Sequence, residues 1–212
     1  MLLVKLIIKK TVKIRMNQKE LKERAKNLCN LDYWLFVLVY LVFSSIISIV
    51  SSSYGVPLLV VGGPLTAGFI MFNLNYIREN NGNFLNLFDG FKRFTDYFLT
   101  YLLEFAYIFL WTLLFIVPGI IKALSYSQSL YIMYDNPGIG PKDALDLSEK
   151  MMNGHKMELF KLHLSFIGWH ILGILTLGIL EVFYVGPYYN ATLALYYEEL
   201  KKQSQEKNIT IE

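Results

Sequence analysis

The sequence predicts an all-α protein: a polytopic membrane helix bundle with six transmembrane helices in three hairpins, plus short cytoplasmic amphipathic helices. Hydrophobic residues make up 54% of the 212 residues and charged residues 17%, whereas soluble proteins carry about 25% charged residues. The mean hydropathy is +0.39. A soluble domain of this size needs more charged surface to cover its core. The composition therefore excludes disordered chains, collagens, coiled coils and most soluble enzymes.

The first hairpin is predicted from a long segment without charge. Residues 33–77 contain no Asp, Glu, Lys, Arg or His, and this run is 45 residues long. One spanning helix needs about 20 residues, so the run must hold two helices and a turn. Serines, Gly55 and Pro57 mark that turn. We therefore expect helices over 33–52 and 56–77.

Two further apolar blocks predict the other hairpins. Residues 97–134 are interrupted by Pro118-Gly119, and residues 162–197 carry only Glu181 and two histidines as titratable groups apart from tyrosines. Each block is long enough for two helices. The expected helices are 97–117, 119–134, 162–180 and 182–199.

The basic residues predict the orientation. With six spans, 19 of the 20 lysines and arginines fall on one side, and Lys122 is the exception. The positive-inside rule makes that side cytoplasmic, together with both termini. If 119–134 failed to span, the four lysines within 135–161 would move outside. The domain layout is a cytoplasmic segment 1–32, a transmembrane domain 33–199 and a cytoplasmic tail 200–212.

The N-terminal segment holds a helix-start signal. Asn17 is a suitable N-cap and Glu20 follows at the third helical position. Residues 1–15 contain two short apolar runs cut by lysines, too short for a signal peptide. We expect translation to start at Met16.

Two cytoplasmic segments have helical amphipathic patterns. In 84–94, Phe and Leu follow helical spacing opposite polar residues, which suits either a helix in the membrane interface or a helix capping the bundle. The segment 141–153 has Pro141 at its first position and Asn153-Gly154 as an end signal. Ala144, Leu145, Ser148 and Met152 line one side of it.

Sequence motifs for known chemistry are not found. The chain has no phosphate-binding loop, dinucleotide fingerprint, HExxH or GxSxG motif. The single cysteine, Cys29, excludes a disulfide framework and is either an inert buried side chain or a modified thiol. We expect no catalytic residue, no cofactor, no metal and no nucleic-acid partner.

Polar residues inside the predicted spans are the candidate functional residues, because such groups face protein or a cavity rather than lipid. Helical depth suggests a Glu104–His170 pair in the inner half. At the outer end, Lys122 either pairs with Glu181 or snorkels outward. The Pro64 kink of the second helix either lines a substrate site or shapes packing. The candidates are Glu104, Lys122, Ser125, Ser129, His170 and Glu181.

Several stretches along the chain form a recognisable series, in this order: Met16–Lys22, Pro118–Ala123, Ser125–Ser127, Asp135–Pro137, Ser148–Lys156, Leu159-Phe160, Leu164–Trp169 and Pro187-Tyr188. Together they resemble the domain of unknown function 975 family of bacterial integral membrane proteins. The resemblance covers roughly residues 16–202 and implies a bacterial cell membrane as the location. It implies no activity, cofactor or catalytic residue.

Three functional hypotheses remain from the sequence. A transporter-like or channel-like protein is suggested by the kinked helix and the polar residues within the spans. A non-catalytic adaptor, assembly factor or permease subunit could dock a partner through 84–94 and 141–153. A membrane enzyme is disfavoured, because the histidines and carboxylates are few and dispersed. The expected partners are the lipid bilayer and either another protein or a second copy.

Overall fold

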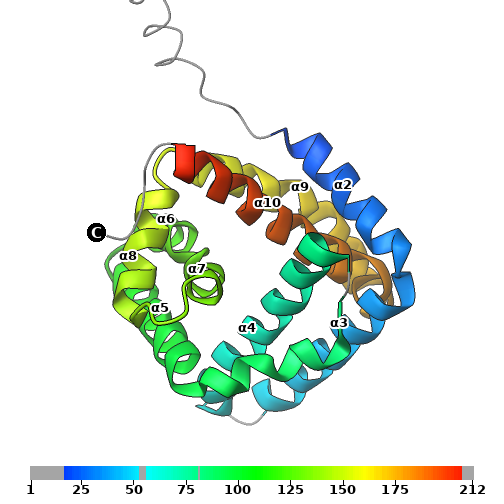
Figure 1. Cartoon of the computed structure of the whole chain (residues 1–212), viewed down its shortest axis with the longest axis horizontal. Helices are drawn as coiled ribbons and strands as arrows, with labels where there is room; N and C mark the ends of the chain where they lie inside the picture. Colours follow the sequence, from blue (N-terminus) through cyan, green and yellow to red (C-terminus); the bar gives the residue numbers. More distant parts are fainter. Residues whose placement is uncertain (1–16, 53–55, 81, 207–212) are drawn as a thin grey trace, which may run out of the picture.

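The computed structural model is all-helical (89% helix), with no strand among its described residues, which are 17–52, 56–80 and 82–206. Helix α4 runs through the middle of the bundle, and the other helices surround it (Figure 1). The elements are α2 (Gln18–Leu31), α3 (Tyr33–Ser51), α4 (Val56–Glu79), η1 (Phe84–Arg93), α5 (Phe94–Leu114), α6 (Ile116–Tyr126), α7 (Ser129–Asp135), α8 (Pro141–Met151), α9 (Lys156–Leu175), η2 (Glu181–Val185) and α10 (Gly186–Glu206).

Within residues 17–52, 56–80 and 82–206, four helical segments are long and apolar enough to cross a membrane: Tyr33–Ser51, Pro57–Glu79, Phe84–Leu114 and Lys156–Leu175. The second of these is largely buried inside the bundle, whereas few residues of the other three are fully buried. Exposed apolar helices in a folded protein indicate contact with lipid or with a partner. The all-helical class is thus confirmed, while six spans in three hairpins remain a prediction.

The predicted helix 119–134 differs from the structure. It is divided into α6 and α7, with Ser127 and Gln128 between them. Ser127 and Ser125 donate hydroxyl hydrogen bonds back to carbonyls of α6, a pattern that bends helices. The break lets α8 pack against α5, α6 and α7, so this segment does not have the geometry of one straight span.

Small residues on α4 allow close contact with its neighbours. A side chain at Gly63 would collide with the carbonyl of Tyr97 on α5, and one at Gly68 would collide with the carbonyl of Leu87 on η1. The glycines at positions 63 and 68 of this helix therefore serve packing. The backbone of η1 fits against α4 for the same reason at Gly90.

Both amphipathic segments are helical, but they differ in how much of the apolar face is buried in the bundle. η1 is a 3₁₀ helix that buries Leu87 and Gly90 and leaves Leu85, Phe88 and Phe91 exposed. The face of α8 that carries Ala144, Leu145, Ser148 and Met152 is fully buried in the bundle. Segment 84–94 thus caps the bundle with one side and keeps an exposed aromatic side.

Local signals at the ends of helices are confirmed where the structure describes them. Asn17 accepts hydrogen bonds from the backbone of Lys19 and Glu20 at the start of α2. Gly154, with φ of +85°, follows α8 in the backbone conformation that glycine adopts most easily. The expected start at Met16, the loop 53–55 and residues 207–212 of the tail lie outside the described residues.

An ionic network joins α4, α7 and α10 at one end of the bundle. Arg78 donates to both carboxylate oxygens of Asp135, at 2.7 and 2.9 Å, and to Glu198 at 2.6 Å. Lys201 and Tyr197 donate to Asp135 as well, at 2.6 and 2.8 Å. The two Tyr-acid dipeptides at the ends of the apolar blocks, Tyr134-Asp135 and Tyr197-Glu198, thus converge on one arginine.

Candidate functional site

The polar residues predicted within the spans fall into two separate groups. His170 and Glu181 belong to a set that we call the α9–η2 polar cluster, which consists of Tyr40, His163, His170, Glu181 and Tyr189. Glu104, Lys122, Ser125 and Ser129 belong to a second group on α5, α6 and α7. Among the described residues, no hydrogen bond connects the two groups.

The α9–η2 polar cluster is built around Glu181. One carboxylate oxygen of Glu181 lies 3.0 Å from Nδ1 of His170, and the other accepts a hydrogen bond of 3.2 Å from the hydroxyl of Tyr40. The imidazole of His170 packs edge-on against the ring of Tyr189, with 5.1 Å between centroids. The hydroxyl of Tyr189 lies 2.7 Å from Nδ1 of His163. The cluster therefore brings together five titratable side chains, which come from α3, α9, η2 and α10.

Two glycines make room for this cluster. A side chain at Gly173 would meet the carboxylate of Glu181 at 2.9 Å, and one at Gly186 would overlap the ring of Tyr40. Glu181 also begins a short π-helical segment, in which Gly186 donates to the carbonyl of Glu181 five residues earlier. Single π-helical turns are rare and are frequent at functional sites. The backbone irregularity is thus located where the ionisable groups are.

Pro187 explains a further contact beside the cluster. Proline has no N–H, so the carbonyl four residues earlier, that of Phe183, lacks its ordinary helical donor. The hydroxyl of Tyr33 donates to this carbonyl at 2.8 Å. The first residue of α3 is thereby fixed against η2.

Two members of the second group contact each other, and a third pairs with a carboxylate on α8. Ser129 donates to Glu104 at 3.0 Å, and the ammonium of Lys122 lies 2.8 and 2.9 Å from the two carboxylate oxygens of Glu149 on α8. The Lys122 ammonium also lies 5.5 Å from the Trp111 ring centre. Such a set of contacts fixes α6 between α5 and α8.

The two pairs suggested by helical depth are wrong. His170 contacts Glu181 and not Glu104, while Lys122 contacts Glu149 and not Glu181. Depth along ideal straight helices says nothing about which helices are neighbours. The break after α6 and the return of α8 place Glu149, expected in a cytoplasmic segment, beside Lys122.

Sequence reasoning missed three members of these sites. Tyr40 and Tyr189 were not distinguished from the many interfacial tyrosines, because their spacing carries no signal. Glu149 lies on the charged side of an amphipathic helix, where a solvated carboxylate is the ordinary expectation. The spacing of His163, His170 and Glu181, at 7 and 11 residues, was the usable signal for the cluster.

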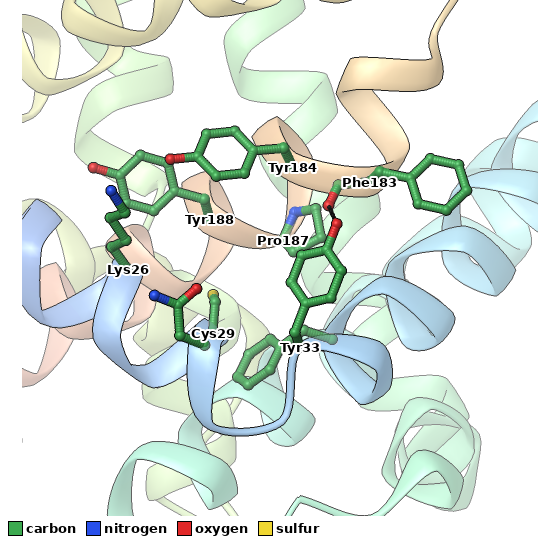
Figure 2. A pocket seen from close by; sticks show the side chains of 9 residues that line it. Lys26, Cys29, Tyr33, Phe183, Tyr184, Pro187 and Tyr188 are labelled. Atoms are coloured by element: carbon green, nitrogen blue, oxygen red, sulfur yellow. Dashed lines mark hydrogen bonds between the residues drawn. The ribbon is translucent and has the colours of Figure 1, made fainter.

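A small open pocket with a cavity volume of about 20 Å³ lies beside the cluster, between α2 and the η2–α10 segment. Lys26 faces the tyrosines of η2 and α10 across it, and Tyr33 reaches Phe183 at one end (Figure 2). Cys29 lines its inner wall, and burial raises the pKa of this thiol to about 12. A thiol with so high a pKa is a poor nucleophile, so Cys29 acts as a small packing residue. The other lining residues are Asn30, Phe36, Tyr184, Pro187 and Tyr188.

No three His, Cys, Asp or Glu side chains come together as metal ligands in the part of the chain that the structure describes. The α9–η2 polar cluster instead offers groups that bind and release protons: one carboxylate, two imidazoles and two phenols. Hydrogen bonds join Tyr40, Glu181 and His170 in one set and His163 with Tyr189 in another, and the two sets meet through the ring contact between His170 and Tyr189. Clusters of such groups within membrane helices are typical of proton relays.

Part of the chain matches a known protein family. Residues 116–204 match the family described as "Protein of unknown function (DUF975)". This segment runs from the start of α6 almost to the end of α10 and includes most of the α9–η2 polar cluster. No curated protein and no solved structure matches the chain.

Proposed function

We propose that the chain is a non-enzymatic integral protein of a bacterial cell membrane, of transporter-like or channel-like type, and the match of residues 116–204 to the domain of unknown function 975 family supports a membrane protein. Four helical segments that could cross a membrane support the location. The family description names no activity. The type of function therefore depends on the polar groups among the apolar helices.

The α9–η2 polar cluster is the observation that carries this proposal. An ionisable side chain within the hydrocarbon costs about 2.5–3.5 kcal/mol on insertion scales, and such side chains ordinarily pair with one another and mark ion or proton pathways. Here Glu181 and His170 are kept together, with Tyr40 and Tyr189 extending the contacts to α3 and α10. We propose that the cluster is a proton relay within this membrane protein.

Proton flux into proteoliposomes tests the proposal. With a pH-sensitive dye inside the vesicles and an imposed membrane potential, the wild-type protein should acidify the lumen. Glu181→Gln and His170→Gln should each slow this flux at least tenfold, because each removes a titrating group. Glu23→Gln, an exposed carboxylate on α2, is the matched control and should leave the flux unchanged. Equal flux in all four proteins would exclude the relay.

In the proposed orientation, both termini and the segments that connect one hairpin to the next lie on the cytoplasmic side. The positive-inside rule supports it, since 19 of 20 basic residues fall on that side. Reporter enzymes fused after Gly82 and after Asn153 should both read cytoplasmic. A periplasmic or external reading for either fusion would contradict this orientation.

An adaptor role is the second candidate, and the exposed side of η1 favours it. Leu85, Phe88 and Phe91 remain uncovered, so either a protein partner or lipid headgroups could contact them. Residues Leu145 and Met152 are buried and cannot dock a partner directly. Photo-crosslinkers at positions 88 and 91 should therefore capture a partner, and crosslinks to lipid alone would remove the adaptor role.

A further inference from the structure

The turn between α9 and η2 is exposed and apolar. Ile174, Leu175, Leu177 and Ile179 all project from the bundle, and Leu177 is 93% exposed. Thr176 is the one polar side chain between residues 174 and 180. Its hydroxyl donates to the carbonyls of Leu172 and Gly173 in the preceding helix. A turn in water would ordinarily carry polar residues, so the surroundings of this turn are apolar.

The backbone of the same turn leaves no N–H group for water. The N–H groups of residues 176 to 180 all donate within the turn, four of them to backbone carbonyls and that of Leu180 to the hydroxyl of Thr176. Leu177 takes a positive φ of 53° to achieve this, although asparagine or glycine would do so more easily. Satisfying backbone donors internally is a requirement in hydrocarbon and not in water.

A charged helix lies beside the hairpin that this turn closes. Helix α2 packs on α10, and its side chains reach α9: Gln18 donates to the carbonyl of Glu158 and Lys22 to that of Ser165. Further along, Lys26 shares a pocket with Phe183, only six residues beyond Leu177. The exposed side of α2 carries Lys19, Glu20, Glu23, Arg24 and Lys26.

These contacts limit how deep the hairpin can reach. Ser165 lies 11 positions before Thr176, about 16 Å at 1.5 Å per residue, which is about half of the ~30 Å hydrocarbon thickness. The pocket shared by Lys26 and Phe183 lies still closer to the turn. If the hairpin crossed the bilayer completely, the charged side of α2 would lie within the hydrocarbon. Helix α2 therefore stays at the membrane surface, and the turn lies inside the bilayer.

We infer that the α9–η2 hairpin is re-entrant: its turn inserts among the lipid acyl chains from the side on which α2 lies and returns without reaching the opposite surface. The inference rests on the proposed membrane location and adds the depth of one segment. It agrees with the positive-inside pattern, because a re-entrant hairpin and a pair of spans both return the chain to the same side. The α9–η2 polar cluster then lies between the charged helix and the inserted turn.

The α5–α6 turn has the same character. Leu113 to Val117 are all exposed and apolar, and Lys122, seven residues past Phe115, is paired with Glu149 on the charged helix α8. By contrast, the α3–α4 hairpin ends in the exposed serines Ser51 and Ser52, as expected of a turn that reaches water. Ser52 is thus the natural control position.

Accessibility to a charged, membrane-impermeant maleimide tests the inference in a Cys29→Ala background. Right-side-out and inside-out membrane vesicles carrying the full chain are labelled before and after addition of detergent. Leu177→Cys should resist labelling from both sides and react once detergent is added, whereas Ser52→Cys should react from the outside. Labelling of Leu177→Cys in either type of vesicle, without detergent, would overturn the inference.

A second pair of variants does not depend on thiol reactivity. Leu177→Asp should reduce the yield of membrane-inserted protein at least fivefold, because it places a carboxylate among acyl chains, while Leu177→Gly should not reduce it, since glycine accepts the positive φ. Equal yields for Leu177→Asp and the control Ser52→Asp would also overturn the inference. Release of the wild-type protein by alkaline carbonate would instead refute the membrane location itself, so the two failures are distinguishable.

Discussion

Replacing Asp135 by Asn should destabilise the protein more than any other single change in the ionic network. The carboxylate is 6% exposed and accepts from Arg78, Lys201 and Tyr197. Removing one partner of a buried pair costs about 3–5 kcal/mol. Arg78 and Lys201 are about one-third exposed and Arg78 keeps Glu198, so solvent screening lowers the expected loss to about 2 kcal/mol.

The loss should depend on pH in a defined direction. Burial tends to raise the pKa of Asp135, but the hydrogen bonds from Arg78, Lys201 and Tyr197 outweigh it, so the pKa lies below the ordinary value of about 3.9. A carboxyl whose pKa is lowered on folding contributes stability above its unfolded pKa and loses it as pH falls through the folded pKa. Asp135→Asn should therefore remove part of the acid destabilisation below about pH 4.

Thermal unfolding of the detergent-solubilised protein at pH 7 and at lower pH measures both effects. Tyr197→Phe is the matched control, because it deletes one hydrogen bond to the same carboxylate and should cost about 1 kcal/mol. If Asp135→Asn were no more destabilising than Tyr197→Phe at pH 7, the ionic network would not hold α4, α7 and α10 together.

Three other changes probe separate contacts. Lys122→Met and Glu149→Gln should each lower the unfolding temperature, and the double variant should lose less than the two losses combined, because the pair is already broken by either change; additive losses would refute the contact. Gly186→Ala should destabilise by about 1–3 kcal/mol, since a methyl group there overlaps Tyr40, and an unchanged unfolding temperature would contradict the packing. Cys29 should resist iodoacetamide at pH 8 until the protein is unfolded, because its thiol is buried and its pKa is about 12; rapid alkylation of the native protein would show the opposite.

The parts of the fold that were predictable rest on local chemistry. A charge-free run of known length predicts α3 and α4, and Pro141 with Gly154 predicts the ends of α8. The N-cap at Asn17 is equally local. Such signals depend on residues a few positions apart, which the sequence states directly.

The parts that were not predictable depend on which helices are neighbours. The division of 119–134 at Ser127-Gln128 has no proline or glycine to announce it. Once the chain bends there, α8 returns along α6 and supplies Glu149 to Lys122. The two wrong pairs follow from this tertiary rearrangement and not from an error in helical spacing.

Depth in the membrane was also beyond the sequence pattern. The positive-inside rule depends on the basic residues in the segments that connect one hairpin to the next. These segments lie on the same side of the membrane whether a hairpin crosses the bilayer or turns back within it. The distinction becomes visible only when the contacts of α2 with α9 and α10 are known. The candidate site was predicted in part, since His170 and Glu181 were named but assigned to different partners.

The central claim is that Glu181 and His170 act as one unit in moving protons. The most direct test is a double-mutant cycle on the proteoliposome proton flux, with Glu181→Gln, His170→Gln and the double variant measured at one membrane potential. Residues of one relay are strongly non-additive, so the double variant should be no slower than the slower single variant. Flux reductions that multiply, or a double variant as fast as the wild type, would contradict the account.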